Sequence, residues 1–371
     1  MIELDTLKDD VPEVILESVK SLGTDIDIET YSKKGANGYV FFGHNKVSKI
    51  NLAIKYYYYG KDFHDEVRLL ARIDNENIIK ILDAHTVGEG WAYFLTQQTS
   101  HGDLDDALAK GIISYRDGIN VVRGILNGLV DLHGGVGGER LLHRDLKPAN
   151  ILLDDKLKPI IADFGSVKML PAGNSHINAS KHAPLYRPPE GFANNIYLIS
   201  SDIYQVGLVM FQILGGYLPY SDLEWMSEKQ RAIYCRIDDA YERSKYLEQV
   251  LYSRAKSRKL MNLNSLPKYV SDNVKNIIRV ATRPDYTKRY QSCSRYLLAV
   301  HDLGVLPDWH NKRETIELWN FKGLDYRIIP IRNMYKVEKK KTISNNWRTD
   351  NTFGTAEKDE MIIRLKNFLH I

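Results

Sequence analysis

The sequence is short of features that would mark several classes of protein. It has only two cysteines in 371 residues, and Cys235 and Cys293 have neither metal-ligand spacing nor the density of a disulfide framework. We expect both to be buried thiols. No apolar run approaches the roughly 20 residues of a membrane helix, and the N-terminus lacks the basic start and apolar stretch of a signal peptide. These absences predict a cytoplasmic protein with no membrane partner.

Strong charge of one sign is also missing. The formal net charge is +4 at pH 7, so the whole molecule gives little reason to expect nucleic acid as a partner. Hydrophobic residues make up 43% and charged residues 26%, the balance of a folded globular chain rather than a disordered one. The length predicts one main two-lobed unit with a modest appendage.

Hydrophobic periodicity predicts a small sheet after a leading helix. Apolar residues recur at helical spacing over 12–22. The stretch 27–59 carries β-branched and aromatic runs divided by turns, which predicts three antiparallel strands, and 78–85 and 91–98 supply two more. Between them, 63–73 places apolar side chains on one helical face. Five strands and one main helix therefore precede the second half of the chain.

The second half is predicted to be mainly helical. Segments 121–133 and 201–214 carry helical hydrophobic patterns, and the latter is apolar enough to be buried. No internal repeat or low-complexity linker interrupts this part of the chain. A larger, mostly α-helical lobe therefore follows the sheet.

The strongest chemical signal is the motif HRDLKPAN at 143–150, followed after an apolar strand by Asp163-Phe164-Gly165. The two motifs resemble signatures of the eukaryotic-type (Hanks-type) protein kinase superfamily, and of its serine/threonine kinases. The resemblance implies an α+β fold of two lobes. The N-lobe would be a small sheet of five antiparallel strands with one main helix, and the C-lobe would be larger and mainly α-helical.

The reach of the motifs implies a division of the chain. The kinase-like part covers about 27–301, with the N-lobe at about 27–96 and the C-lobe at about 103–301. Residues 1–26 would be an N-terminal helical extension. Residues 302–371 would be a C-terminal extension of unknown role.

By the resemblance, the motif residues align a protein hydroxyl with the γ-phosphate of ATP and neutralise the charge on its oxygens. Asp145 would accept or orient the proton of the substrate hydroxyl, and Lys147 would steady the γ-phosphate. Asn150 and Asp163 would hold Mg²⁺, or Mn²⁺, bridging the phosphates. The alternative, a polar surface turn, does not account for two motifs at the separation typical of the family.

Upstream, Lys55 lies on the third predicted strand, where the family's VAIK lysine contacts the α- and β-phosphates. Glu66 on the following helix is its expected partner, with Glu76 as the fallback. The alternatives are a lysine on an edge strand and a solvated helix glutamate.

A glycine-containing segment between the first two strands aligns with the family's GxGxxGxV, although Lys33 replaces the first glycine. Gly35 and Gly38 would let the backbone approach the phosphates, and Val40 would cover the adenine. We assign Ala53 to the same cofactor-binding set. A Gly-Asn-Gly hairpin turn is the alternative for this segment.

The resemblance places the adenine of ATP between the lobes. Thr96 would be the gatekeeper, and main-chain groups of Gln97 and Thr99 would pair with the adenine edge. Asp103 would reach the ribose hydroxyls or cap the next helix, and the two roles can coexist. Leu152 would close the floor under the adenine.

The segment APLYRPPE at 183–190 resembles the family's TPxYxAPE. Together with Lys147 it favours a protein substrate phosphorylated on serine or threonine. Ala183 stands where a threonine usually bonds the catalytic groups, which leaves substrate positioning open. By the same resemblance, Glu190 would pair with Arg289, and Asp202 would brace the catalytic-loop backbone.

Arg144 precedes the catalytic aspartate, where the family commonly pairs an arginine with a phosphate on the activation segment. Ser166, Ser175 and Ser180 lie in that segment, so we expect autophosphorylation at one of them.

Two other classes remain as alternatives, a pseudokinase scaffold and a kinase-fold enzyme acting on a small molecule. The tail also stays open. It has strand-like pieces at 315–321 and 325–331, the basic run Lys339–Lys341, and an amphipathic segment at 360–369. It is either a packing extension or a module that docks substrate or contacts nucleic acid.

Overall fold

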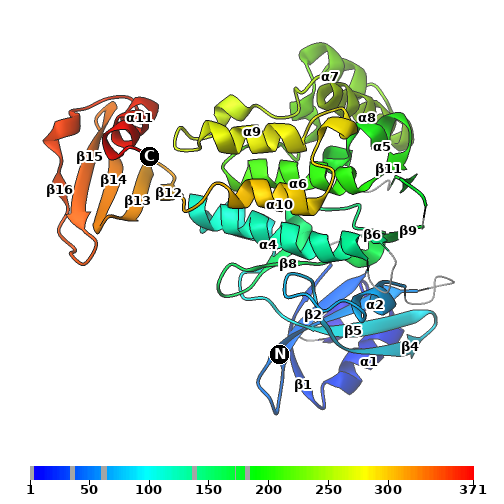
Figure 1. Cartoon of the computed structure of the whole chain (residues 1–371). Coiled ribbons are helices and arrows are strands. Elements are labelled where there is room, and N and C mark those ends of the chain that lie inside the picture. Colours follow the sequence, from blue (N-terminus) through cyan, green and yellow to red (C-terminus); the bar gives the residue numbers. More distant parts are fainter. Residues whose placement is uncertain (1–3, 34–37, 60–64, 136–139, 172, 180–183) are drawn as a thin grey trace.

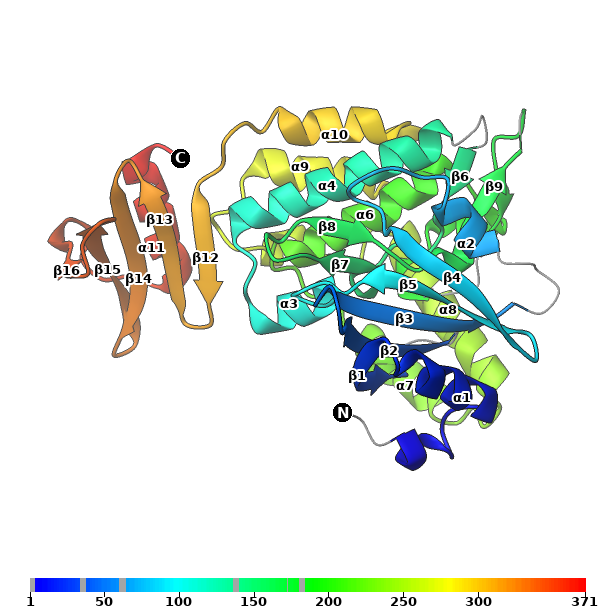
Figure 2. The same cartoon turned by 90° about the horizontal axis from the view of Figure 1, so that it is seen from below.

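The computed structural model describes residues 4–33, 38–59, 65–135, 140–171, 173–179 and 184–371. It has a smaller and a larger lobe, and the C-terminal part of the chain forms a unit beside the larger lobe and away from the smaller one (Figure 1; Figure 2). The smaller lobe is built on an antiparallel sheet and the larger lobe is mainly helical. The predicted α+β, two-lobed fold class is therefore confirmed.

The sheet of the smaller lobe has five strands, as predicted. In spatial order they are β1 (Ile26–Ser32), β2 (Tyr39–Asn45), β3 (Asn51–Tyr58), β5 (Trp91–Gln97) and β4 (Ile81–Gly88). Side chains alternate across β3, so Ile54 and Tyr56 face one side while Lys55 and Tyr57 face the other.

The two faces of this sheet are covered differently. The predicted leading helix is present as α1 (Glu13–Leu22), and its Ile15 and Val19 pack in one cluster with Ile54 and Tyr56. On the opposite face, Tyr57 packs with partly buried Val67 of the helix α2 (Asp65–Leu70). The face of β3 that carries Lys55 is therefore the one that turns toward the larger lobe.

The helix α2 ends at Leu70, three residues before the predicted end at 73, and the predicted start at 63 lies outside the described residues. At its end, the amides of Arg72 and Ile73 donate to carbonyls three residues back. The chain thus tightens into a turn instead of continuing as an α-helix.

The strand β4 begins at Ile81, three residues later than predicted. The first residues of the predicted strand connect the lobes instead. Ile78 forms a parallel bridge with Ile161, and the amide of Ile79 donates to the carbonyl of Ile161 at 2.9 Å. The apolar run 78–85 predicts a single strand. In the structure its first residues pair at Ile161, whereas the residues from Ile81 onward pair with β5.

The larger lobe contains eight of the described α-helices and three short strand pairs. The helices are α3 (Leu104–Lys110), α4 (Tyr115–Gly134), α5 (Pro189–Ala193), α6 (Ile199–Ile213), α7 (Glu228–Tyr234), α8 (Ala240–Lys256), α9 (Asp272–Ala281) and α10 (Cys293–His301). The strand pairs are β6 (Arg140–Leu142) with β9 (Lys168–Leu170), β7 (Ile151–Leu153) with β8 (Pro159–Ile161), and β10 (Ile177–Asn178) with β11 (Ile196–Tyr197).

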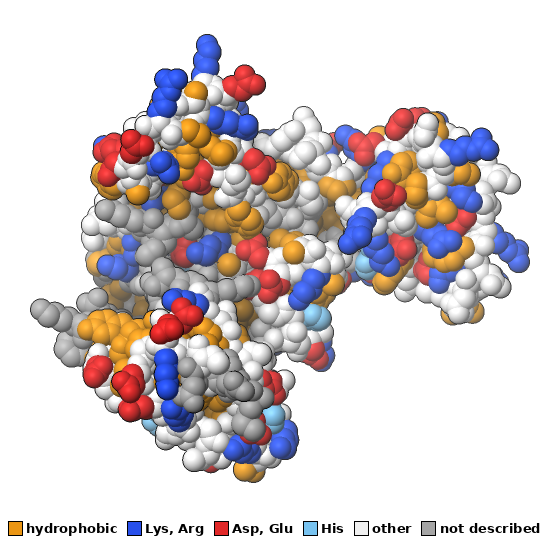
Figure 3. Space-filling view, turned by 180° about the vertical axis from the view of Figure 1, so that it is seen from behind, with side chains coloured by type: hydrophobic (Ala, Val, Ile, Leu, Met, Phe, Trp, Pro, Cys, Tyr) orange, Lys and Arg blue, Asp and Glu red, His pale blue; other side chains and the backbone are white. Residues whose placement is uncertain are grey.

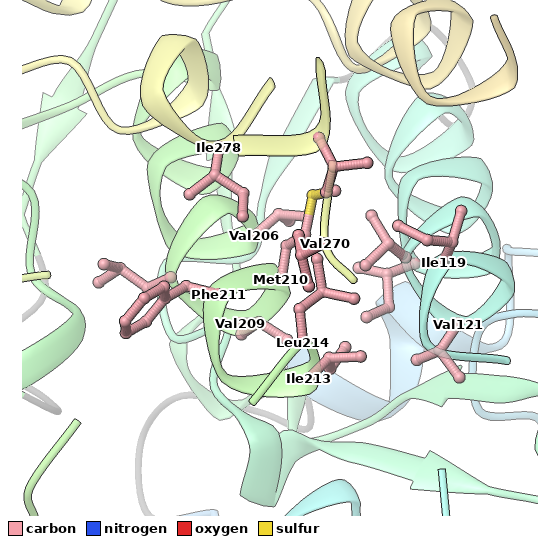
Figure 4. Close-up of a cluster of buried hydrophobic side chains, with 14 of the residues drawn as sticks. Ile119, Val121, Val206, Val209, Met210, Phe211, Ile213, Leu214, Val270 and Ile278 are labelled. Carbon is pink, nitrogen blue, oxygen red and sulfur yellow. The ribbon is translucent and has the colours of Figure 1, made fainter. Parts of the chain in front are cut away.

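The helix α6 lies at the centre of this lobe, as its apolar sequence predicts. All of its residues after the first are buried. Figure 4 shows Val206 and Met210 among side chains of α4 and α9, including Ile119 and Ile278. A helix that is buried on every side needs this surrounding shell, and it gives the site a rigid base.

The C-terminal unit is an antiparallel meander with one helix against it. Its elements are β12 (Asp308–Lys312), β13 (Thr315–Phe321), β14 (Leu324–Ile331), β15 (Met334–Lys341), β16 (Arg348–Thr349) and α11 (Lys358–Leu369). The predicted strands at 315–321 and 325–331 are present, and the amphipathic segment at 360–369 lies within α11. The other three strands were not predicted.

This unit is fastened to the larger lobe by stacking and a hydrogen bond. The Trp309 ring of β12 stacks on Tyr269, with 5.5 Å between ring centroids and 10° between planes. Nε of Arg116 on α4 donates to the carbonyl of Leu306 at 2.8 Å.

Cys293 is buried, as expected, but the expectation for Cys235 was wrong because it is exposed. It caps α7, a polar helix with no buried residue. Among the described residues, no helix has both the length and the apolar character needed to cross a bilayer.

Candidate active site

A cavity of about 460 Å³ lies between the lobes. Eleven of the fifteen residues predicted from the sequence to form the site line it. They are Gly38, Val40, Ala53, Lys55, Thr96, Gln97, Thr99, Asp103, Asn150, Leu152 and Asp163. The chain therefore brings together residues from the first strands, the connection between the lobes and the start of β7.

Asp145 is held beside this cavity by two neighbours. Lys147 Nζ lies 2.8 Å from Oδ2, and Nδ2 of Asn150 donates to Oδ2 at 3.0 Å and to the main-chain carbonyl of Asp145 at 2.7 Å. The other carboxylate oxygen, Oδ1, is buried and has no hydrogen-bond partner within the described part of the chain. A buried acceptor without a donor is costly, so Oδ1 is available for a hydroxyl group.

Asp163 and Lys55 face each other in the cavity. Nζ of Lys55 lies 3.2 Å from Oδ1 of Asp163 and 5.6 Å from the centroid of the Phe94 ring. Burial by itself would raise the pKa of Asp163, but the charge and hydrogen bond of Lys55 outweigh it and hold that pKa below its usual value. The carboxylate is therefore ionised at neutral pH.

The backbone places Asp163 in a left-handed conformation, with φ +61° and ψ +74°. Few residues other than glycine, asparagine and aspartate adopt it readily. The next residue, Phe164, is buried and its ring packs edge-on against His143, with 5.3 Å between centroids. Because of this turn, the Asp163 carboxylate lies in the cavity while the Phe164 ring packs in the core.

Asp202 braces the backbone of the HRDLKPAN loop, as predicted. Its carboxylate accepts hydrogen bonds from the amides of His143 and Arg144, both at 2.9 Å. It also accepts from Tyr197 Oη at 3.1 Å and lies 2.8 Å from Nε2 of His133. This buried carboxylate from α6 therefore fixes the backbone just before Asp145.

A second brace was missed in the sequence. Oε1 of Gln205 accepts from the amide of Leu146 at 2.9 Å. Gln205 lies one helical turn after Asp202 on the same α-helix, so the i, i+3 spacing in SDIYQ could have indicated it.

The protonation of His133 makes the stability of the fold depend on pH. Burial alone would lower its pKa, but Cys293 and the Asp202 carboxylate outweigh burial and raise the pKa to about 10. A histidine in the unfolded chain titrates near ~6.5. The contribution of the charged ring is therefore complete below ~pH 6.5 and is lost as the pH rises toward about 10.

We expect urea denaturation to give a lower free energy of unfolding at about pH 9 than at about pH 6. In His133→Gln, which keeps a donor for Asp202 but does not titrate, this pH difference should be smaller. Identical pH profiles for the two proteins would contradict the role of His133.

The connection between the lobes forms the opposite wall of the cavity. Thr96 is buried at the end of β5. Oδ1 of Asp103 accepts from the amide of Asp106 at 2.9 Å, so Asp103 is the N-cap of α3. It also lines the cavity, so the capping role and a contact with a ligand are compatible here.

Further residues line the cavity that were not predicted from the sequence. They are Ser32, Phe42, Ile79, Phe94, Gln98, Ser100, His101, Gly102, Asp106, Lys110, Ala149 and Ala162. Most of them are neighbours of predicted residues, at alternate positions of the same strands or along the connection, and the period of two along β2 and β5 could have indicated Phe42 and Phe94.

Two buried arginines, Arg144 and Arg289, each bond to residues that lie far away in the sequence. The guanidinium of Arg144 donates to the main-chain carbonyls of Ser166 at 3.1 Å and Asn178 at 2.9 Å. The predicted pair of Glu190 and Arg289 is confirmed. It is bidentate, with two bonds of 2.7 Å, and both side chains are almost fully buried.

Some of the predicted residues fall outside the described part of the structure. Gly35, Ser180 and Ala183 belong to segments that it does not cover, and the side chain of Glu66 on α2 is likewise outside it. The fallback, Glu76, is described. It lies on the surface, where Oε2 is 3.5 Å from Nζ of Lys158.

Comparison with known proteins agrees with this geometry. The chain is similar to cysteine-rich receptor-like protein kinase 42 of Arabidopsis thaliana, at 30% identity over 193 residues, 49% of this chain and 29% of that protein. It is also similar to a G-type lectin S-receptor-like serine/threonine-protein kinase of the same plant, at 31% identity over 161 residues, 42% of this chain and 20% of the relative. The chain thus spans less than a third of the length of these relatives. The family model for the protein kinase domain matches residues 34–297, and the chain belongs to the protein kinase family.

Proposed function

We propose that the chain is a serine/threonine protein kinase that transfers the γ-phosphate of ATP to protein hydroxyl groups. The observation that carries the proposal is Oδ1 of Asp145, which has no partner among the described residues and belongs to a carboxylate bonded to Asn150, a residue that lines the cavity together with Lys55 and Asp163. Phosphoryl transfer asks mainly for alignment and charge neutralisation, and these groups supply both.

In this proposal, Oδ1 of Asp145 receives the hydrogen bond of the acceptor hydroxyl and orients its oxygen toward the γ-phosphate. Lys147, now 2.8 Å from Oδ2, neutralises charge on the γ-phosphate. Lys55 binds the α- and β-phosphates from the far side of the cavity, and Glu66 positions Lys55. Gly35 and Gly38 let the backbone approach the same phosphates.

The residues present fit a magnesium ion. Asp163 is an ionised carboxylate that lines the cavity. Because Nδ2 of Asn150 is used toward Asp145, its amide oxygen is the atom left for a cation. Oxygen ligands suit Mg²⁺ and Mn²⁺, and two protein ligands are enough when phosphates and water supply the others. When bound, the ion neutralises the phosphates.

The adenine is proposed to bind between Val40 and Leu152, with Thr96 behind it and the main chain of Gln97 and Thr99 along its edge. Ala53 completes the apolar wall, and Asp103 meets the ribose. All of these residues line the same cavity, which supports the assignment.

The substrate class is proposed from Lys147, from the 183–190 segment and from the names of the relatives, some of which are serine/threonine-protein kinases. Autophosphorylation is proposed at Ser166, Ser175 or Ser180, of which Ser175 is exposed. A cytoplasmic location stays a prediction from the sequence.

For residues 302–371 we propose a packing role rather than a nucleic-acid site. Figure 3 shows basic and acidic side chains interspersed over this unit. Within the basic run, Nζ of Lys339 lies 2.8 Å from the carboxylate of Asp350, and Nζ of Lys340 lies 3.2 Å from that of Asp325. Cations that are already paired contribute less to binding phosphates.

The test is incubation of the full chain with labelled ATP and Mg²⁺, followed by mass-spectrometric mapping of phosphosites on the protein itself and in a cell lysate. We expect phosphoserine or phosphothreonine, with the rate about a hundredfold or more lower in Asp145→Asn. Asn keeps the size of the side chain and cannot act as a base. Phosphotyrosine alone would overturn the serine/threonine assignment. If neither the protein itself nor any protein of the lysate gains an Asp145-dependent phosphate, a scaffold or a small-molecule kinase would be favoured instead.

A further inference from the structure

The main chain at 143–146, which includes Asp145, is held by side chains. Each of its four amides donates to a side-chain atom. The first two donate to the carboxylate of Asp202, the third to Nδ1 of His143 and the fourth to Oε1 of Gln205. Because buried amides need acceptors, the course of the chain through Asp145 depends on these three side chains.

Gln205, on the α-helix α6, bonds the peptide groups on both sides of Asp145. Oε1 accepts from the amide of Leu146 at 2.9 Å, and Nε2 donates to the carbonyl of Arg144 at 3.4 Å. The side chain is only 2% exposed, and a buried polar group that loses its partner is costly. One side-chain amide therefore restrains the backbone torsions on both sides of the Cα atom of Asp145.

The residue before Asp145 has a backbone that needs such a restraint. Arg144 has φ +72°, in the left-handed region that is unfavourable for a residue with a long side chain. Its amide is bonded to Asp202 and its carbonyl to Gln205, so two side chains of α6, one helical turn apart, hold this residue. Strained conformations persist where the surroundings over-determine them. Without Gln205, the carbonyl of Arg144 would be released, and the Cα–Cβ bond of Asp145 would turn with it.

We propose that Gln205 is a positioning residue for phosphoryl transfer, which fixes the main chain on both sides of Asp145 and thereby the direction of Oδ1. This rests on the proposed function, in which Oδ1 orients the acceptor hydroxyl. Gln205 does not line the cavity between the lobes, so it acts through Asp145. Its loss should therefore slow the transfer step and leave the binding of ATP and of the protein substrate unchanged.

The first experiment compares the kinetics of the full chain with those of Gln205→Met, which keeps the length of the side chain and removes both bonds. On a serine peptide that wild type phosphorylates, kcat should be lower by about tenfold to a hundredfold, because small displacements of reacting groups cost this much. KM for ATP and for the peptide should stay within about twofold of wild type.

Thr282→Val is the matched control for a change in the packing of α6. Thr282 is buried and packs against α6 at Gly207, and its Oγ1 donates to the carbonyl of Ile278 at 2.8 Å. This variant also loses a buried hydrogen bond, but far from Asp145. It should keep the kcat of wild type, whether or not its melting temperature falls.

Gln205→Glu separates positioning from packing by its pH dependence. A protonated glutamic acid can accept from the amide of Leu146 and donate to the carbonyl of Arg144, as glutamine does, whereas the ionised form cannot donate. Burial and the nearby Asp202 carboxylate should raise the pKa of the introduced carboxyl group. We expect kcat close to that of wild type at about pH 6 and lower by about tenfold or more at about pH 8.5. The ratio of Gln205→Met to wild type should not depend on pH.

Three outcomes overturn the proposal: an unchanged kcat in Gln205→Met, a rise in its KM in place of the fall in kcat, or a Gln205→Glu that differs from wild type by the same factor at both pH values. If Gln205→Met does not fold, Gln205→Glu decides alone. If wild type transfers no phosphate, the proposed function fails on its own. The restraint is then tested by amide hydrogen exchange at Leu146, which should be about tenfold or more faster in Gln205→Met than in wild type and in Thr282→Val. Equal exchange rates overturn the proposal.

Discussion

Phosphotransfer by Asp163→Asn should be lower than that of wild type by on the order of a thousandfold. A bound metal contributes several kcal/mol of charge stabilisation, and each ~1.4 kcal/mol is tenfold in rate. Asparagine suits the left-handed backbone at this position, φ +61°, so the fold should be kept and only the negative charge removed. The variant should also need a higher Mg²⁺ concentration for half-maximal activity.

The measurement is a Mg²⁺ titration of the rate, with the melting temperature taken in parallel. Asp154→Asn is the matched control, because Asp154 lies in the turn after β7, where Oδ1 only accepts from the amides of Lys156 and Lys158. Its rate should stay close to that of wild type. An unchanged Mg²⁺ dependence in Asp163→Asn would remove Asp163 from the proposed metal site.

Removing the guanidinium of Arg289 should cause the largest loss of stability. In Arg289→Met, Glu190 would remain as a buried charge without its cation, which typically costs about 3–5 kcal/mol. The variant would also remove the hydrogen bond that Arg289 donates to the carbonyl of Ser200. For a chain of this size, we expect the melting temperature to fall by roughly 5 °C.

The double variant Arg289→Met with Glu190→Gln should recover part of this loss, because a neutral amide can still accept the hydrogen bond that Ser201 now gives to Glu190. Glu360→Gln is the surface comparison. It removes the partner of Arg364 on α11, an exposed pair of i, i+4 spacing, and should cost less than about 1 kcal/mol. A similar loss in Arg289→Met and Glu360→Gln would show that burial of the Glu190 pair contributes nothing.

The sequence predicts best where several consecutive residues act together. The HRDLKPAN and DFG motifs place Asp145, Asn150 and Asp163 close in sequence to apolar residues that fix them, such as Phe164 in the core. Runs of β-branched and aromatic residues divided by turns likewise predicted the strands of the smaller lobe, because such side chains suit a pleated, half-buried surface.

The sequence predicts least where distant segments choose between partners. Ile78 continues an apolar run and yet pairs with Ile161 rather than with β5. The strand β12 begins at Asp308 and is mostly polar, and its place depends on the stacking of Trp309 on Tyr269. Neither preference can be read from local propensity, because tertiary contacts decide both.

The contact of α1 with the sheet has a practical consequence for how the protein is prepared. The family match begins at residue 34, so a protein trimmed to it would lack both α1 and β1. The apolar side chains of Phe41 and Ile54, now fully buried, would become accessible to water, and β2 would be left as a bare edge strand. Exposed edges next to apolar surface promote association between chains. A fragment designed on family boundaries would therefore be prone to aggregate, whereas one that keeps the chain from residue 4 would stay dispersed.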